Sequence, residues 1–190
     1  MNDIEKKIKT NGLKSGLILG LIITALSIAS YYLITTTSSP FVFVGAPVIF
    51  SVFIPIFCVI FLSFKARTNV GGYWTFKQAV TGIFIMFLVA FIFNYLGKEI
   101  IFNKFIEPDN TTKVQTAAVN AKIAILKERH SSQALIDQNV AELKKDFSQP
   151  SASIGNALTG IVISIIFVFI LALIFGALFK KDAPAYAPQS

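Results

Sequence analysis

The side chains that most often carry chemistry are scarce in this sequence. It has one histidine, His130, in a polar stretch and one cysteine, Cys58, in an apolar stretch. A single cysteine cannot form an intramolecular disulfide or build a cysteine metal site, and we expect Cys58 to pack as a small apolar residue. We expect His130 to be solvated. Because no paired carboxylates, metal-ligand cluster, nucleophile elbow or phosphate loop can be recognised, we predict no enzyme activity, no cofactor and no metal.

Two neutral polar residues, Asn94 and Asn156, are predicted near the outer ends of apolar stretches. Their amides can hydrogen-bond each other, which is the interpretation we favour, or hold a lipid head group. No Asp, Glu, Lys, Arg or His lies deep in an apolar stretch. A charge at mid-bilayer costs about 2.5–3.5 kcal/mol on insertion scales, and proteins keep such charges mainly for proton relays and ion paths. The sequence therefore gives no sign of a proton-coupled transporter.

The elements that carry these residues are long and apolar. Apolar residues make up 54% of the sequence and charged residues 14%, whereas a soluble domain has about 25% charged residues. No charge occurs in residues 15–64, 78–97 or 147–179. A run of about 20 apolar residues crosses the hydrocarbon layer as a helix. The sequence thus predicts an all-α integral membrane protein, a four-helix transmembrane bundle with a small helical insert.

Four spans are predicted, at residues 12–35, 41–64, 79–97 and 154–179. Residues 36–40 are turn formers that end in proline, and residues 65–78 form the next loop. The insert, residues 98–153, lies between spans three and four. Its apolar residues recur at helical spacing in two segments, which indicates two amphipathic helices or one long helix with a break.

Basic residues flank the spans unevenly. Nine Lys or Arg and three acidic residues lie in or beside the N-terminus (1–11), the loop 65–78 and the C-terminus (180–190), while the turn 36–40 has no charge. Cytoplasmic loops are enriched in Lys and Arg, so both termini are predicted to be cytoplasmic and the insert extracytoplasmic. The charges form no continuous basic face, which argues against nucleic-acid binding. A cleaved N-terminal signal peptide fits less well, because its apolar region is usually about 7–15 residues.

Small residues form a row on the first span, with Gly12, Gly16, Gly20 and Thr24 spaced four apart. Such rows let two helix backbones approach closely in lipid. The favoured interpretation is packing against another span of the same chain, and a homodimer seam is the alternative.

The second span contains Pro47 and Pro55. Each proline removes a backbone donor and predicts a kink. Kinked spans line the sites of many transporters but are also common in spans without such a role.

The loop before the third span carries the most specific pattern. Gly71 and Gly72 permit a chain reversal, Trp74 is expected to anchor at head-group level, and Thr75 is placed to cap a helix beginning at Phe76 and Lys77. The two glycines followed by Thr-Phe-Lys-Gln-Ala, before an apolar span, resemble the membrane family called domain of unknown function 4199, found mainly in Bacteroidota. The resemblance extends over about residues 8 to 181. It implies a four-span bacterial inner-membrane protein with no established activity, and suggests an envelope-assembly partner.

Two functions are therefore open. The first is an accessory or scaffold subunit of a membrane complex, which binds another membrane protein or a second copy of itself. The alternative is a transporter or binding protein for a lipid or small amphiphile, which rests on the kinked second span and the neutral polar residues near the outer face. Membrane lipid is expected to surround the protein in either case.

Overall fold

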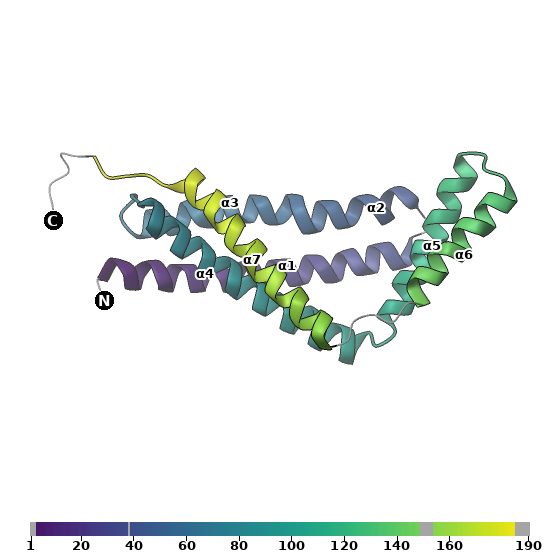
Figure 1. Cartoon of the computed structure of the whole chain (residues 1–190). Coiled ribbons are helices and arrows are strands. Elements are labelled where there is room, and N and C mark those ends of the chain that lie inside the picture. The colour runs from purple at the N-terminus through teal and green to yellow at the C-terminus, as the bar shows by residue number, and fades with distance from the viewer. Residues whose placement is uncertain (1–2, 38, 149–153, 185–190) are drawn as a thin grey trace. The chain divides into compact units, whose positions relative to one another are not determined.

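A computed structural model of the chain describes residues 3–37, 39–148 and 154–184, and the side chains of residues 154–158 lie outside this description. The described residues fold into helices, with no β-strand among them. The α-helices are α1 (Asp3–Thr36), α2 (Pro40–Val48), α3 (Ile54–Asn69), α4 (Phe76–Asn94), α5 (Asn110–Glu128), α6 (Gln133–Ser148) and α7 (Ile154–Phe179) (Figure 1). Two π-helical segments, η1 (Ile49–Phe53) and η2 (Tyr95–Ile106), continue α2 and α4 without a break.

Four helical stretches are long and apolar enough to cross a membrane, at Asp3–Thr36, Pro40–Asn69, Phe76–Ile106 and Thr159–Phe179. The predicted all-helical class, with four helices long and apolar enough to cross a membrane, is therefore confirmed. The first and third stretches extend beyond the predicted spans at 12–35 and 79–97. The backbone hydrogen bonds of a helix do not depend on apolar side chains. A helix can therefore extend past its apolar part into polar residues.

The chain forms two compact units. Unit one comprises residues 1–23, 55–95 and 158–190, and unit two comprises residues 24–54 and 96–157. Unit one thus contains the first part of α1 together with nearly all of α3, α4 and α7. Its core is made of small and aliphatic side chains from these four helices, each at most 5% exposed: Leu19, Val59, Leu62, Ala66, Ala79, Ile83, Met86, Ala90 and Ala172.

The glycine row of α1 packs against α4 within unit one. A Cβ atom placed on Gly12 would lie 2.7 Å from the carbonyl oxygen of Gly82, and one placed on Gly20 would lie 2.7 Å from Cβ of Phe93. Gly16 meets α4 between these two points. The small residues therefore bring two helix backbones of the same chain into direct contact, and this surface of α1 is occupied within the monomer.

Thr24, the fourth member of the row, belongs to unit two. It is 9% exposed, and a Cβ placed on Gly97 of η2 would lie 2.8 Å from its Cγ2. The Thr24 side chain therefore packs against η2 at Gly97, where η2 has no side chain.

The two prolines of the second stretch bracket a change of helix type. Pro47 lies inside α2, Pro55 lies in the first turn of α3, and η1 separates them. A proline cannot donate to the carbonyl four residues earlier, and a wider π-helical turn is one way in which a helix accommodates a lost bond. The helix continues through this region, so the prolines change its winding without ending it.

Unit two is built around one aromatic cluster and the insert. Phe102 of η2 is 2% exposed and lies edge-on to Tyr31, with ring centroids 5.1 Å apart. Helix α5 contacts both α2 and α6. The predicted insert, residues 98–153, begins with the end of η2, and α5 and α6 follow, joined by residues 129–132. In this turn His130 takes a φ of 54°, and the Ser132 hydroxyl accepts a 3.4 Å hydrogen bond from the Leu135 N–H. The two amphipathic segments are therefore separate helices joined by a tight, capped turn.

Candidate functional site

The loop between α3 and α4 holds the ends of unit one together. Gly71 and Gly72 have φ values of 105° and 83°, a region that side chains with a Cβ rarely adopt. The reversal places Trp74 inside the unit, at 1% exposure, with its ring over Gly82. Tyr73, 41% exposed, is the neighbouring ring left at the surface. The sequence favoured Trp74 as a head-group anchor, whereas the structure uses it as a core residue.

The same loop fixes the C-terminal end of α7. The N–H of Trp74 donates to the Lys181 carbonyl and the N–H of Lys181 donates to the Trp74 carbonyl, both at 2.8 Å. The Arg67 guanidinium donates to the Phe179 carbonyl at 3.3 Å, one of the acceptors that a helix end leaves unpaired. The family motif therefore has a structural task, which is to tie the end of α7 to the α3–α4 loop.

The predicted capping of a helix by Thr75 is confirmed. Helix α4 begins at Phe76, the Thr75 hydroxyl accepts from the Gln78 N–H at 3.4 Å, and the Gln78 side chain accepts from the Thr75 N–H at 3.0 Å. This reciprocal pair is a capping box. Phe76 and Lys77 are exposed.

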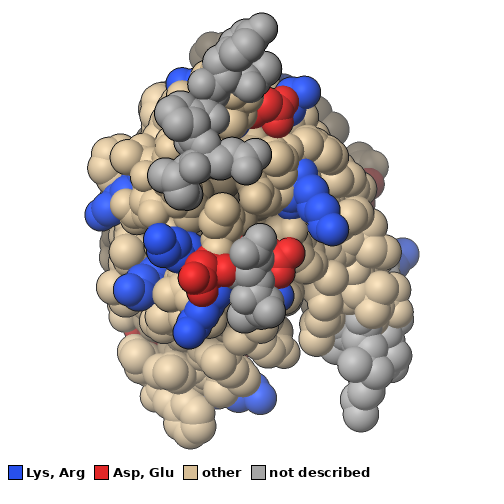
Figure 2. Space-filling view, turned by 90° about the vertical axis from the view of Figure 1, so that its left-hand side faces the viewer, with Lys and Arg blue, Asp and Glu red and all other residues tan. Residues whose placement is uncertain are grey.

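A cleft of about 360 Å³ opens beside this helix start, and we call it the unit-one cleft. Glu5, Ile8 and Lys9 of α1 line one side of it, and the other side is formed by Thr75, Lys77, Gln78 and Thr81. The nine Lys and Arg residues that flank the spans all belong to unit one, and we call the end of the unit that holds this cleft its basic end. Figure 2 looks onto this end and shows Lys and Arg side chains spread over it, with fewer Asp and Glu.

Unit two contains a polar cluster at the end of α1. Tyr32 donates a 3.2 Å hydrogen bond to Oε1 of Glu107, and Tyr31 donates a 3.4 Å bond to Oε2. The Lys113 ammonium of α5 forms a hydrogen-bonded ion pair with the same carboxylate. Glu107 therefore joins the end of α1 to the start of α5, and it is shielded, with a side chain only 16% exposed.

A cleft of about 450 Å³ opens over this cluster, and we call it the unit-two cleft. The cluster residues and hydroxyl groups line it, together with one amide: Tyr31, Tyr32, Thr35, Thr36, Glu107, Thr112, Lys113, Thr116 and Asn120. Three of these, Thr112, Thr116 and Asn120, lie four residues apart on α5 and also line a second hollow of about 500 Å³ against α6. A polar row on α5 is thus accessible from two sides.

The lining of the unit-two cleft offers more acceptors than donors. The hydroxyls of Thr35 and Thr36 donate to backbone carbonyls one turn earlier, at 2.8 and 2.6 Å, and Thr116 does the same at 2.9 Å. Each hydroxyl oxygen keeps lone pairs that can accept from a ligand. The cleft carries one carboxylate and one ammonium, so its lining has no net charge.

The ion pair in this cleft predicts a pH dependence. The hydrogen bond from Lys113 holds the pKa of Glu107 below its ordinary value of 4.5, and the same bond raises the pKa of Lys113 above 10.5. A lowered acid pKa stabilises the fold above 4.5 and loses that effect as pH falls through the folded value. The raised Lys pKa gives stability below 10.5 that is lost at higher pH.

We therefore expect the unfolding midpoint to be flat between pH 5 and 10 as far as this pair is concerned, and to fall below pH 4.5. Glu107→Gln should lower the midpoint at neutral pH and flatten the acid limb, as followed by circular dichroism in detergent. Glu128→Gln, at an exposed carboxylate in the last turn of α5, is the control. Equal pH curves for wild type and Glu107→Gln would contradict the role given to the pair.

Other sequence-predicted residues are not brought into a site. Asn94 lies at the end of α4, but the side chain of Asn156 lies outside the described residues, so their contact stays a prediction. Cys58 is half-buried against the unit-one core. The Glu107 cluster was missed, although the adjacent Tyr31 and Tyr32 at a span end were a signal, because tyrosines favour the membrane interface.

Four apolar helices, with polar clefts near their ends, indicate a multi-pass α-helical membrane protein. The chain belongs to the family described as protein of unknown function (DUF4199), whose pattern matches residues 14–181. The family predicted from the loop motif is thereby confirmed. No curated protein and no solved structure matches the chain.

Proposed function

We propose that the protein binds an amphiphile in the membrane and holds its polyhydroxylated head group in the unit-two cleft. The observation that carries this proposal is the chemistry of the cleft, where threonine hydroxyls, an amide and a neutral ion pair surround two tyrosine rings at the end of an apolar helix. Such a lining suits a sugar or polyol, whose many O–H groups donate to the hydroxyl oxygens and to Glu107. Sugar C–H groups can pack on Tyr32, which is 41% exposed and presents an apolar ring with a polar tip.

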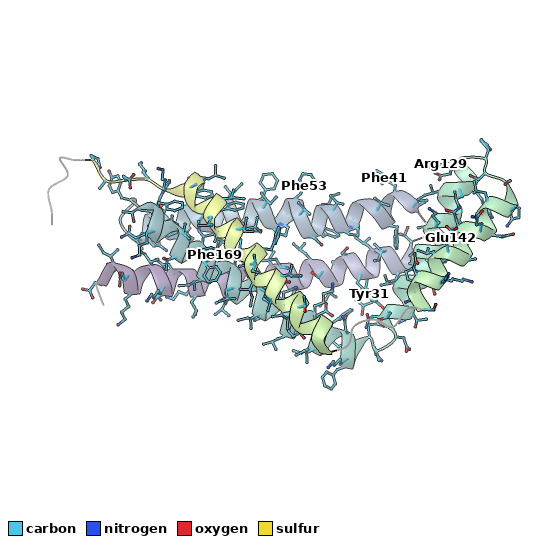
Figure 3. All side chains as sticks on the ribbon, viewed as in Figure 1. Tyr31, Phe41, Phe53, Arg129, Glu142 and Phe169 are labelled. Carbon is cyan, nitrogen blue, oxygen red and sulfur yellow. The ribbon has the colours of Figure 1, made fainter. Side chains whose placement is uncertain are left out.

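A second candidate, an accessory subunit of a membrane complex, is supported by the exposed face of the second membrane-crossing helix. Phe53, Phe57 and Phe61 lie four residues apart and are 55%, 69% and 68% exposed. Phe41 and Phe53 point outward from the helix (Figure 3). Such a face contacts lipid or a partner. The other support for this function, the small-residue row, is occupied by α4, so we rank it second.

One experiment separates the two functions. The tagged full chain is extracted directly into lipid nanodiscs, and everything that leaves the membrane with it is identified by mass spectrometry. Enrichment of a lipid with a sugar or polyol head group is the expected result. A stoichiometric protein partner without lipid enrichment would favour the accessory role.

The cleft itself is tested with a matched pair of variants. Thr116→Val removes a hydroxyl from the unit-two cleft with little change in shape, and should lower the enrichment several-fold. Thr111→Val makes the same change at an exposed position of α5 outside the cleft and should leave it unchanged. Equal enrichment by both variants would place the lipid elsewhere.

We further propose that the basic end of unit one is cytoplasmic in a bacterial inner membrane and that the insert is extracytoplasmic. The support is the gathering of basic flanks from α1, α4 and α7 at one end, which follows the positive-inside rule. In a Cys58→Ser background, a cysteine at Gln133 should react with an impermeant thiol reagent in cells with a permeable outer membrane. A cysteine at Thr68 should react only after the inner membrane is broken, and the opposite pattern would reverse the orientation.

A further inference from the structure

The unit-one cleft is distinct from the proposed amphiphile site and has the opposite electrostatic character. Lys9 from α1 and Lys77 from α4 line it, against a single carboxylate from Glu5. All three side chains are exposed, so the cleft is open to a ligand. Its surroundings add positive charge, because unit one carries nine basic and three acidic residues and Lys and Arg predominate on this end (Figure 2).

The polar groups of the cleft fit a phosphate. The Thr75 hydroxyl accepts from the Gln78 N–H and so keeps its own proton to donate. Lys9 and Lys77 supply ammonium groups from two different helices, and Lys binds phosphate as a point charge. The Thr81 hydroxyl donates to the Lys77 carbonyl of the same helix at 2.8 Å. Its proton is therefore already used and is not donated to the ligand.

The position of the cleft indicates the source of that phosphate. Its floor is Ile8, which is 2% exposed and packs on Gly82, so the cleft lies where the apolar bundle begins. On α1 the residues that follow Lys9 at four-residue spacing are Leu13 and Leu17, which are 49% and 45% exposed. The positive charge of Lys9 and the apolar strip of Leu13 and Leu17 therefore follow one another along one side of α1. This order matches a phosphate joined to an acyl chain.

We propose that the unit-one cleft binds the phosphate of an anionic phospholipid, with an acyl chain along the Leu13–Leu17 strip of α1. Basic pockets between membrane helices on the cytoplasmic side are suited to anionic head groups. Arg67 and Lys181 are not among the residues that line this cleft. The lipid would bridge the starts of α1 and α4, close to where their backbones meet at Gly12.

The test uses the full chain in nanodiscs of phosphatidylcholine with a minority of phosphatidylglycerol, and counts retained lipids by native mass spectrometry. The double variant Lys9→Gln/Lys77→Gln should lose about tenfold in its preference for phosphatidylglycerol, which corresponds to about 1.4 kcal/mol. Lys6→Gln/Lys180→Gln removes the same charge from the same end outside the cleft, and should lose far less. Equal losses would show a diffuse basic surface and overturn the proposal.

Two further arms sharpen the result. Glu5→Gln removes the one carboxylate of the cleft and should increase retention of phosphatidylglycerol, whereas a decrease would contradict the assigned site. Inorganic phosphate in excess should leave the bound lipid in place, because it lacks the chain that packs on Leu13 and Leu17. Displacement by inorganic phosphate would make this a soluble-anion site and overturn the lipid assignment.

Discussion

Gly16→Leu is expected to lower the free energy of unfolding by about 3 kcal/mol, at the upper end of the usual cost of overpacking. A Cβ on Gly16 would lie 2.7 Å from the Met86 carbonyl oxygen and 2.7 Å from Cβ of Val89. One of these atoms is backbone and the other is the first atom of a branched side chain. Neither can rotate away, so α1 and α4 must separate. Thermal unfolding in detergent, followed by circular dichroism, measures the effect.

The control for this variant is Gly160→Leu in α7, at an exposed glycine whose added Cβ would meet no atom of the described residues within 4 Å. Leucine is a better helix former than glycine by up to about 1 kcal/mol, so this variant should be neutral or slightly stabilised. Gly16→Ala should fall between the two leucine variants. A Gly16→Leu protein as stable as Gly160→Leu would show that α1 and α4 do not pack closely through this face.

Some features of the fold could be predicted because their signals are local. Charge-free runs identified four apolar helices, and Thr75 followed by Gln78 three residues later identified the start of α4. The spacing of Gly12, Gly16 and Gly20 predicted a close helix contact but left its partner open. A small-residue row has the same sequence whether its partner is α4 or a second copy of the chain. Only the fold assigns it to α4.

The candidate sites depend on contacts that the sequence does not encode locally. Glu107 receives hydrogen bonds from Tyr31 and Tyr32, which precede it by 76 and 75 residues. The unit-one cleft likewise joins Lys9 to Lys77 across two helices. In the sequence these lysines count only as flanking charge, which predicts orientation. Their convergence into a cleft requires the packing of α1 on α4, and that packing follows from the glycines.

Trp74 illustrates how a general preference can be overridden. Tryptophans near span ends favour the head-group level, and the sequence predicted an anchor. Here the two glycines reverse the chain so that the ring packs over Gly82, where the absence of a side chain leaves room. Its Nε1 atom has no hydrogen-bond partner among the described residues. A buried N–H without a partner costs about 1–3 kcal/mol, so the ring is retained for its volume and apolar area rather than for its polar tip.

Trp74→Ala is therefore expected to lower the free energy of unfolding by about 3–5 kcal/mol, the usual cost of emptying a core tryptophan site. Trp74→Phe should cost much less, because it keeps an aromatic ring and removes the unpaired N–H. Since Trp74 is the only tryptophan of the chain, its fluorescence tests the same placement in the wild type. Emission at short wavelength that resists aqueous quenchers is expected for a ring with 1% exposure. Emission quenched as readily as that of a free indole would show that Trp74 lies exposed at the membrane surface. The burial that underlies the large expected cost of Trp74→Ala would then be contradicted.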